Sequence, residues 1–287
     1  MDINGSTQIA GVFGSPIAHT ASPAMHNAAF AASRLNWVYV ACHVEPAQLR
    51  SALHGARDMH WAGVNLTVPH KLLALDLVDA VDPEARELGA VNTVVIRDGH
   101  LTGYNTDGYG FEQALREDFG MELAGRNVLI LGAGGAGRAL AVKCARAGVR
   151  KLFVANRTPA KLTAVLRDIA AIGTPATPVE FHGPALAAAI HEVDLVVNAT
   201  SVGLKPDDSL HFDTEWFSGR HCVFDTIYNP AETDLLRIAR TAGARVANGL
   251  GMLLHQGARA FELWTQQPAP VEVMRRALRA AIYGDPV

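Results

Sequence analysis

The clearest sign of chemistry in the sequence is a glycine-rich run, Gly132-Ala-Gly-Gly-Ala-Gly137, which directly follows an apolar stretch and precedes a helical one. Glycines let a backbone turn tightly and approach a pyrophosphate, and a helix N-terminus offers free N–H groups and a positive dipole end to phosphates. The strand-before and helix-after context is the one a dinucleotide site requires. S-adenosylmethionine enzymes also use such a loop, so the run by itself predicts a nucleotide-like ligand without choosing one.

The residues that follow the next predicted strand bear on the choice of cofactor. An NAD site carries Asp or Glu about 20 residues after the glycines, for the ribose 2′-hydroxyl. This chain instead has Asn156-Arg157-Thr158, with Lys161 one turn later. A guanidinium pairs well with a phosphate through forked, charge-assisted hydrogen bonds. Cations at a helix start interact unfavourably with the helix dipole, so their presence there indicates a binding role. The pattern therefore favours NADP over NAD.

Other polar residues stand at the ends of predicted strands. Asn65-Leu-Thr-Val-Pro-His-Lys71 places Lys71 at the start of a helix expected to begin at Pro69. A lysine held there can act as general acid and base, although a lysine extending to solvent is commoner. The run Asn198 to Gly203 is expected to line the cofactor crevice, and an ordinary turn explains it equally well.

Two further segments are ambiguous when read alone. His19-Thr-Ala-Ser-Pro23 puts two hydroxyls at a helix N-terminus, where a carboxylate can bind, but Ser22 as a simple N-cap explains half of that pattern. Asp107, in Asn105-Thr-Asp-Gly108, is expected to cap a helix beginning near Tyr109.

The elements that must position these residues alternate between strands and helices. Strands are expected at 9–13, 37–41, 63–67, 128–131, 151–155, 193–197 and 223–225, and helices at 23–33, 136–147, 159–170 and, as a pair, within 250–281. Residues 91–96 and 101–104 flank an Asp98-Gly99 turn and are expected to form a hairpin, and 203–219 a loop. The alternation predicts an α/β protein with a parallel sheet and right-handed crossovers.

Length and composition agree with that class. At 287 residues the chain has room for roughly two domains. Apolar residues make up 49% and charged residues 18%, so a large core can be buried. The 25 basic and 28 acidic residues leave a net charge of −3, which gives no reason to expect nucleic acid or an anionic membrane as partner.

The remaining signals concern the compartment. Cys42, Cys144 and Cys222 are too few and too scattered for a disulfide framework or a metal site. The first five residues lack the charged lead and apolar stretch of a signal peptide, and no apolar run approaches the ~20 residues of a membrane span. A cytoplasmic protein is expected, with no metal.

Together the motifs resemble the shikimate dehydrogenase family over nearly the whole chain. The matching segments are Gly14–Asn27, Asn65–Lys71, Gly89–Thr93, Asn105–Gly108, Gly132–Ala136, Asn156–Thr158, Asn198–Ser201 and Asn248–Met252. The resemblance implies reversible, NADPH-dependent reduction of 3-dehydroshikimate to shikimate, on the route to chorismate and the aromatic amino acids. The two C-terminal helices, with no strand among them, are expected to pack on the first unit, which predicts a discontinuous α/β substrate domain, 1–106 plus 249–287. The remainder, 107–248, is expected to form a Rossmann-type NADP domain with a mainly parallel sheet.

The resemblance assigns roles residue by residue. It gives Lys71 and Asp107 as the catalytic pair. It gives substrate contacts to Thr20, Ser22, Thr67, Asn92, Tyr228 and Gln256, with the first two and Tyr228 near the carboxylate. It gives cofactor contacts to Gly132, Gly134, Gly135, Ala136, Asn156, Arg157, Thr158 and Gly249, and Lys161, Thr200 and Met252 are expected to contact the cofactor as well.

Two other functions are compatible with these residues. The family usually has Ser where this chain has Thr20, so a quinate or aminoshikimate dehydrogenase of the same family is the nearest alternative. A non-catalytic NADPH-binding regulator is another, against which the retained Lys71 and Asp107 argue. The sequence does not reveal the oligomeric state, and a homodimer is kept as an expectation.

Overall fold

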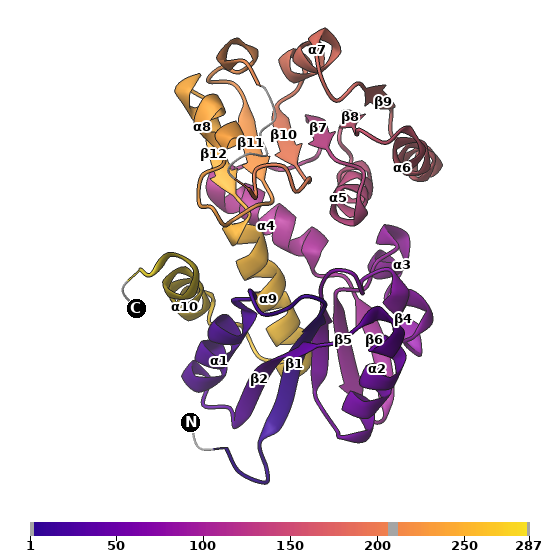
Figure 1. The fold of residues 1–287 in the computed structure, drawn as a ribbon, viewed down its shortest axis with the longest axis vertical. Helices are drawn as coiled ribbons and strands as arrows, with labels where there is room; N and C mark the ends of the chain where they lie inside the picture. The colour runs from indigo at the N-terminus through magenta and orange to yellow at the C-terminus, as the bar shows by residue number, and fades with distance from the viewer. Residues whose placement is uncertain (1–2, 206–211, 286–287) are drawn as a thin grey trace. The chain divides into compact units, whose positions relative to one another are not determined.

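The computed structural model describes residues 3–205 and 212–285. The chain folds as two compact units, unit 1 (Met1–Gly110 with Leu253–Val287) and unit 2 (Phe111–Met252). Figure 1 shows both. The divisions fall inside two helices, α4 (Asp107–Phe119) and α9 (Leu250–Thr265). They lie a few residues beyond the boundaries expected from the sequence, so Asp107 belongs to unit 1.

Unit 1 is built on a six-stranded mixed sheet in the order β2-β1-β3-β5-β6-β4. Its strands are β1 (Gln8–Gly14), β2 (Trp37–His43), β3 (Gly63–Leu66), β4 (Ala80–Val81), β5 (Thr93–Arg97) and β6 (His100–Tyr104). Strand β1 pairs in parallel with both β2 and β3, whereas β5 runs antiparallel to β3 and β6. The predicted hairpin is therefore present, and it makes this sheet mixed rather than purely parallel.

Helices cover both faces of that sheet. They are α1 (Ser22–Ala32), α2 (Leu49–Asp58), α3 (Pro83–Leu88) and α10 (Val271–Tyr283), together with the unit 1 parts of α4 and α9. Successive residues of β3 point to opposite faces of the sheet. A Cβ on Gly63 would meet the Trp264 ring of α9 on one face. On the other face, Val64 packs in the core cluster that holds Leu49 and Leu53 of α2.

Unit 2 is a six-stranded sheet in the order β12-β11-β10-β7-β8-β9, with every pairing parallel. Its strands are β7 (Asn127–Leu131), β8 (Lys151–Ala155), β9 (Ala176–Val179), β10 (Leu195–Asn198), β11 (Cys222–Asp225) and β12 (Arg245–Asn248). Its helices are α5 (Gly135–Arg146), α6 (Pro159–Ile172), α7 (Pro184–Glu192) and α8 (Asp234–Thr241), with the remaining parts of α4 and α9.

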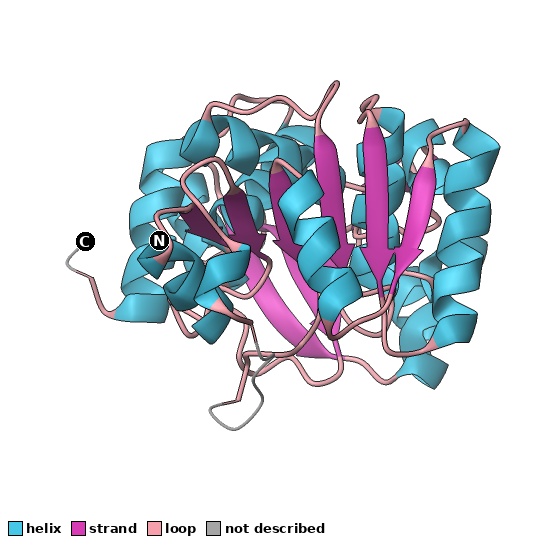
Figure 2. Cartoon of the chain, turned by 90° about the horizontal axis from the view of Figure 1, so that it is seen from above, coloured by secondary structure: helices cyan, strands magenta, loops and turns pink. Residues whose placement is uncertain are grey.

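The apolar run of β7 has a simple cause. Val128 and Ile130 pack in one core cluster and Leu129 and Leu131 in another, so the strand is buried on both faces. Helices lie on both sides of the strands in Figure 2. A parallel sheet covered in this way requires continuous rather than alternating apolar residues, which is why the sequence predicted this strand well.

Two local predictions in unit 1 are wrong. Ser22 is the first residue of α1 rather than its N-cap, and no side chain caps that helix; the N-cap position is Ala21. Lys71 does not start a helix at Pro69. It lies in a turn closed by the bond from the Ala74 N–H to the His70 carbonyl (3.1 Å).

The predicted cap of α4 is also wrong. Asp107 is its first residue, and the capping acceptor is the Asn105 side chain, whose Oδ1 accepts from the N–H groups of Asp107 (3.0 Å) and Gly108 (3.4 Å). The Asp107 carboxylate is thereby left for other partners. The predicted loop 203–219 contains a short 3₁₀ turn, Thr214–Trp216, and residues 206–211 lie outside the described part of the chain.

Candidate active site

One edge of the unit 1 sheet collects the polar segments that the sequence singled out. Strands β1 and β3 end at this edge, β6 ends there, and the antiparallel β5 begins there. The loops at this edge therefore include residues 15–21, 67–72, 91–92 and 105–107. Side chains far apart in the sequence meet because the sheet register brings these strand ends together.

At this edge Lys71 and Asp107 form an ion pair, with 2.7 Å between Nζ and Oδ2. The lysine side chain is 31% exposed and the aspartate 15%, so the pair faces solvent only in part. The second carboxylate oxygen, Oδ1, accepts from the Asn92 side-chain amide (2.9 Å). The carboxylate thus holds the ammonium with one oxygen and is itself held through the other.

Asn92 is the organising side chain of this group. It is 2% exposed, and its Oδ1 accepts from the Thr106 N–H (2.7 Å), which requires its Nδ2 to face the carboxylate. The same Nδ2 lies 3.0 Å from the Thr106 hydroxyl and 3.4 Å from Oε1 of Gln256 on α9. Four of the predicted residues, Lys71, Asp107, Asn92 and Gln256, therefore form one connected cluster.

His70, next to the lysine, is a structural residue. It is fully buried, and its Nε2–H donates to the Val44 carbonyl (2.8 Å). Burial lowers the pKa of His70, so the ring is held neutral. This bond and the one from the Val91 N–H to the Lys71 carbonyl (2.8 Å) fix the turn that carries the lysine.

The hydroxyls assigned to the substrate lie on neighbouring loops of unit 1. Thr20 Oγ1 accepts from the Ser22 N–H (3.3 Å) and donates to the Ser22 hydroxyl (3.2 Å). The hydroxyl hydrogens of Ser22 and Thr67 have no acceptor among the residues that the structure describes. The Thr67 methyl packs against Gly14, where an added Cβ would lie 2.5 Å away. These hydroxyls are thus available to a ligand.

In unit 2 the glycine-rich run turns from β7 into α5. Gly132 has φ of +108°, and a Cβ there would lie 2.9 Å from the Ala199 carbonyl; a Cβ on Gly137 would lie 2.1 Å from the Gly132 carbonyl. Those two glycines are required by the fold. A Cβ on Gly134 or Gly135 would instead meet nothing within 4 Å. Packing does not require glycine at these two positions, whereas close approach of a phosphate to the backbone does, and this open cradle fits a dinucleotide.

Asn156 joins this loop to the end of β8. Its Oδ1 accepts from the Ala133 N–H (3.0 Å), and its Nδ2 donates to the Thr158 carbonyl (2.9 Å). Arg157 and Lys161 follow, both exposed and without a hydrogen bond or ion pair to the described residues. Two uncommitted cations beside a glycine loop, with no carboxylate, fit the 2′-phosphate of NADP.

The other predicted residues of unit 2 follow the strands β10, β11 and β12. Thr200 donates from its hydroxyl to Asn198 Oδ1 (2.7 Å), and its methyl lies beside Gly132. A Cβ on Gly249 would lie 2.1 Å from the Thr226 carbonyl, so close backbone contact requires glycine there. Met252 packs against the core cluster of β7 and α5, and Tyr228 lies on the loop after β11.

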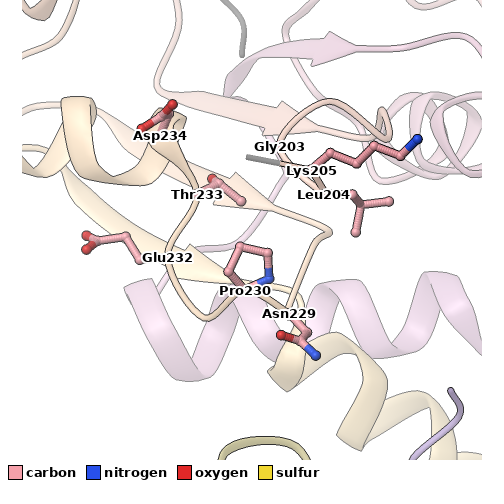
Figure 3. Close-up of a pocket in the computed structure, with 8 residues that line it drawn as sticks. All are labelled: Gly203, Leu204, Lys205, Asn229, Pro230, Glu232, Thr233 and Asp234. Atoms are coloured by element: carbon pink, nitrogen blue, oxygen red, sulfur yellow. The ribbon is translucent and has the colours of Figure 1, made fainter. Parts of the chain in front are cut away.

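Unit 2 also has an open pocket of about 470 Å³ between the loops after β10 and β11. Figure 3 shows it, with the side chains of Lys205 and Glu232 extending in opposite directions. It contains none of the predicted site residues, and its polar groups do not converge on one point.

Some residues of the unit 1 cluster were missed by the sequence reasoning. Asn65 and Thr93 are predicted only as polar residues near strand ends, and Tyr39 and Thr106 are given no role. Asn65 and Thr93 are buried in strands whose other residues are mostly apolar. A polar residue in such a strand needs a partner, and that was the available signal.

Within the described ranges, no group of three or more His, Cys, Asp or Glu is placed to hold a metal ion. No helix there is long and apolar enough to span a bilayer.

The chain is similar to known proteins over nearly its full length. Three family models fit the chain: the shikimate dehydrogenase substrate-binding domain at residues 12–94, shikimate/quinate 5-dehydrogenase at 113–204, and the shikimate 5′-dehydrogenase C-terminal domain at 249–279. An NADP(+) shikimate dehydrogenase of Symbiobacterium thermophilum is 47% identical, over 98% of this chain and 97% of its own.

Solved structures agree. Shikimate 5-dehydrogenase of Thermus thermophilus, in complex with NADP(H) and shikimate, is 39% identical with a TM-score of 0.85, covering 96% of this chain and 99% of its own. Quinate dehydrogenase of Corynebacterium glutamicum, in complex with NAD, is 34% identical with a TM-score of 0.87, covering 96% and 99%. With these relatives spanning nearly its full length, the chain belongs to the shikimate dehydrogenase family.

Proposed function

We propose that this chain interconverts 3-dehydroshikimate and shikimate with NADP(H), and that Lys71 and Asp107 are its acid–base pair. The main observation in its support is the ammonium of Lys71 held 2.7 Å from Asp107, whose carboxylate is bonded to the Asn92 amide, beside loops whose Ser22 and Thr67 hydroxyl hydrogens have no acceptor among the described residues. In the reductive direction the reaction supplies shikimate for aromatic amino acid biosynthesis.

The proton chemistry follows from this geometry. NADPH, which the glycine loop would hold, would supply the hydride that converts a ketone carbon into an alcohol carbon. Negative charge then develops on the ketone oxygen, and the Lys71 ammonium donates a proton to it. Asp107 fixes the position of Nζ, and Asn92 fixes the carboxylate. In the oxidative direction Lys71 accepts the proton of the substrate hydroxyl.

Substrate recognition uses the remaining groups at this edge of unit 1. The hydroxyls of Thr20 and Ser22, at the start of α1, suit a carboxylate, because the Ser22 hydrogen is unpaired, the Thr20 hydrogen can turn from Ser22 to the ligand, and the helix end is positive. Thr67, Asn92 and Gln256 offer a hydroxyl and two amides for the ring hydroxyls. Tyr228 is assigned to the carboxylate through the family resemblance alone.

Cofactor roles go to the residues of unit 2. Gly132, Gly134, Gly135 and Ala136 form the phosphate-binding turn, Asn156 holds it in shape, and Arg157, Thr158 and Lys161 receive the 2′-phosphate. Thr200 supports the turn from β10. Gly249 and Met252 are assigned to the nicotinamide end through the resemblance.

Quinate is the competing substrate, since a family member acts on it. Thr20 favours shikimate in this chain. Its methyl occupies space beside the carboxylate-binding hydroxyls, and quinate, with a tetrahedral carbon and an added hydroxyl at that position, needs more room than shikimate.

The test is a spectrophotometric assay of NADP⁺ reduction by the full chain, with shikimate and quinate side by side and each repeated with NAD⁺. The proposal expects the highest kcat/KM with shikimate and NADP⁺. Preferential oxidation of quinate, or no turnover of shikimate at substrate saturation, would overturn it.

Two further expectations accompany the function. The three cysteines are free thiols, two of them buried, as suits the reducing cytoplasm where we place the enzyme. A homodimer is proposed, and light scattering of the purified chain tests it.

A further inference from the structure

Five side chains of unit 1 form a continuous row of hydrogen bonds that ends at the Asp107 carboxylate. The Tyr39 hydroxyl donates to Asn65 Oδ1 (2.7 Å), and Asn65 Nδ2 donates to the Thr93 hydroxyl (2.9 Å). Thr93 donates to Asn92 Oδ1 (3.0 Å), and Asn92 Nδ2 donates to Asp107 Oδ1 (2.9 Å). Tyr39 and Asn65 lie outside the set of residues assigned to substrate or cofactor.

Every donor in this row points the same way. The carboxylate can only accept, so the Asn92 amide must turn its NH₂ toward it and its oxygen toward Thr93. Asn65 Nδ2 also donates to the Asn92 carbonyl (3.3 Å), which turns the NH₂ of Asn65 toward Thr93, so the Thr93 hydroxyl accepts from Asn65 and keeps its hydrogen for Asn92. The oxygen of Asn65 then faces Tyr39, whose hydroxyl must donate. Aligned donors polarise one another, and the row directs that polarity at the negative charge of Asp107.

The row is isolated from water. Thr93 is fully buried, and Tyr39, Asn92 and Asn65 are 2%, 2% and 6% exposed. Burial raises the pKa of Tyr39 well above its ordinary value, so the phenol stays protonated and remains a donor. Water therefore has little access to replace the Tyr39 bond if the hydroxyl is removed.

Helix α1 holds Tyr39 in place. The Asn27 side chain bonds both backbone groups of Tyr39, accepting from its N–H (2.8 Å) and donating to its carbonyl (3.0 Å). The His26 ring stacks on the tyrosine ring, with centroids 4.3 Å apart and planes 13° from parallel. Ala10 is the register partner of Tyr39 on the intervening strand β1, and its small side chain leaves room for the ring to reach Asn65.

We propose that Tyr39 is a positioning residue for the reaction: through Asn65, Thr93 and Asn92 it keeps the Asp107 carboxylate, and with it Lys71, in the working orientation. The inference rests on the proposed role of Asp107. Without the hydroxyl, the buried Asn65 Oδ1 loses its donor. The Asn65 amide, then held only through its Nδ2 by the Thr93 hydroxyl and the Asn92 carbonyl, can shift and loosen the bonds of the row.

The test compares Tyr39→Phe with Tyr104→Phe, a matched change in unit 1 at a hydroxyl that makes no hydrogen bond to the described residues. The kcat for shikimate oxidation by the full chain should fall roughly 5- to 20-fold in Tyr39→Phe, the effect of one buried hydrogen bond. The KM for NADP⁺ should not change, and Tyr104→Phe should match the wild type.

A double-mutant cycle separates positioning from a general structural effect. In an Asp107→Asn background, Tyr39→Phe should cost less than about twofold more, because its effect passes through the carboxylate. A wild-type kcat in Tyr39→Phe, or the same loss in both backgrounds, overturns the inference.

A second variant provides the same test if Tyr39→Phe does not fold. Thr93→Val removes a hydroxyl from the middle of the row at nearly constant shape, so it should reproduce the loss of kcat. Thr93→Val with wild-type kcat would also overturn the inference. Different results would overturn the proposed function itself: a wild type that does not oxidise shikimate, or an Asp107→Asn variant that keeps full activity.

Discussion

His26 is a histidine held neutral inside unit 1. Its side chain is fully buried, stacked on Tyr39 and 5.4 Å from the Trp264 ring, and neither ring nitrogen has a hydrogen-bond partner among the described residues. A charged imidazolium there would lose its hydration with nothing in exchange. Burial accordingly lowers the pKa of His26 from 6.5 to about 3.

This shift makes stability depend on pH with a definite sign. Below about pH 6.5 the unfolded chain binds a proton at His26, whereas the folded chain does not until about pH 3. The contribution of His26 is therefore fully present above pH 6.5 and is lost progressively as pH falls from 6.5 to 3. Between pH 7 and pH 5 the loss amounts to about 2 kcal/mol of unfolding free energy.

The assay is urea unfolding at pH 7 and pH 5, followed by tryptophan fluorescence. Trp216 is replaced by Phe in every sample, so that the signal comes from Trp37, Trp61 and Trp264 of unit 1. His26→Phe keeps an aromatic ring against Tyr39 and removes the titrating group. The His26 protein should lose about 2 kcal/mol more than the His26→Phe protein over this interval.

An exposed histidine provides the control. His100→Phe, on β6, should lose the same free energy as the parent protein. If the parent and His26→Phe lose equal stability between the two pH values, His26 is not held neutral by burial and the reasoning is wrong.

Two predictions concern specificity. Arg157→Ala should weaken NADP⁺ binding roughly 10- to 150-fold and leave NAD⁺ binding nearly unchanged. Titration calorimetry with both cofactors measures this effect, with Arg167→Ala on α6 as the control. Equal losses of affinity for both cofactors would show that Arg157 supports the fold instead. Thr20→Ser should ease quinate entry and shift the shikimate-to-quinate ratio of kcat/KM by roughly 10- to 200-fold at most, the worth of one methyl group. An unchanged ratio would remove Thr20 from the specificity pocket.

Much of the fold could be predicted because local patterns report burial directly. The run 128–131 is apolar throughout because β7 is covered on both faces, and the Asp98-Gly99 turn forces a hairpin. The helix α2 was missed although Leu49, Leu53 and Ala56 recur at helical spacing and are fully buried. A closer search for the 3.6-residue period would have found it.

The contacts within the site could not be predicted from local sequence patterns. Lys71 and Asp107 meet because two strand ends share a sheet edge, and no spacing along the chain encodes their 2.7 Å contact; the pairing came from the family resemblance. Capping was assigned to Asp107 because its type suits it, yet Asn105 two residues earlier takes that role. The reach of Tyr39 across β1 to Asn65 depends on strand order and register, which only the folded sheet supplies.

Lys71 and Asp107 are expected to act as one acid–base unit on shikimate. The kcat for NADP⁺ reduction by Lys71→Ala, Asp107→Asn and the double variant tests this expectation. Lys71→Ala should lower kcat roughly 10²- to 10⁴-fold while the KM for shikimate changes far less, because the loss falls on proton transfer. The double variant should be little slower than the slower single variant. Near-normal turnover in folded Lys71→Ala, or a double-variant loss equal to the product of the two single losses, would show that the two residues do not act as one acid–base unit.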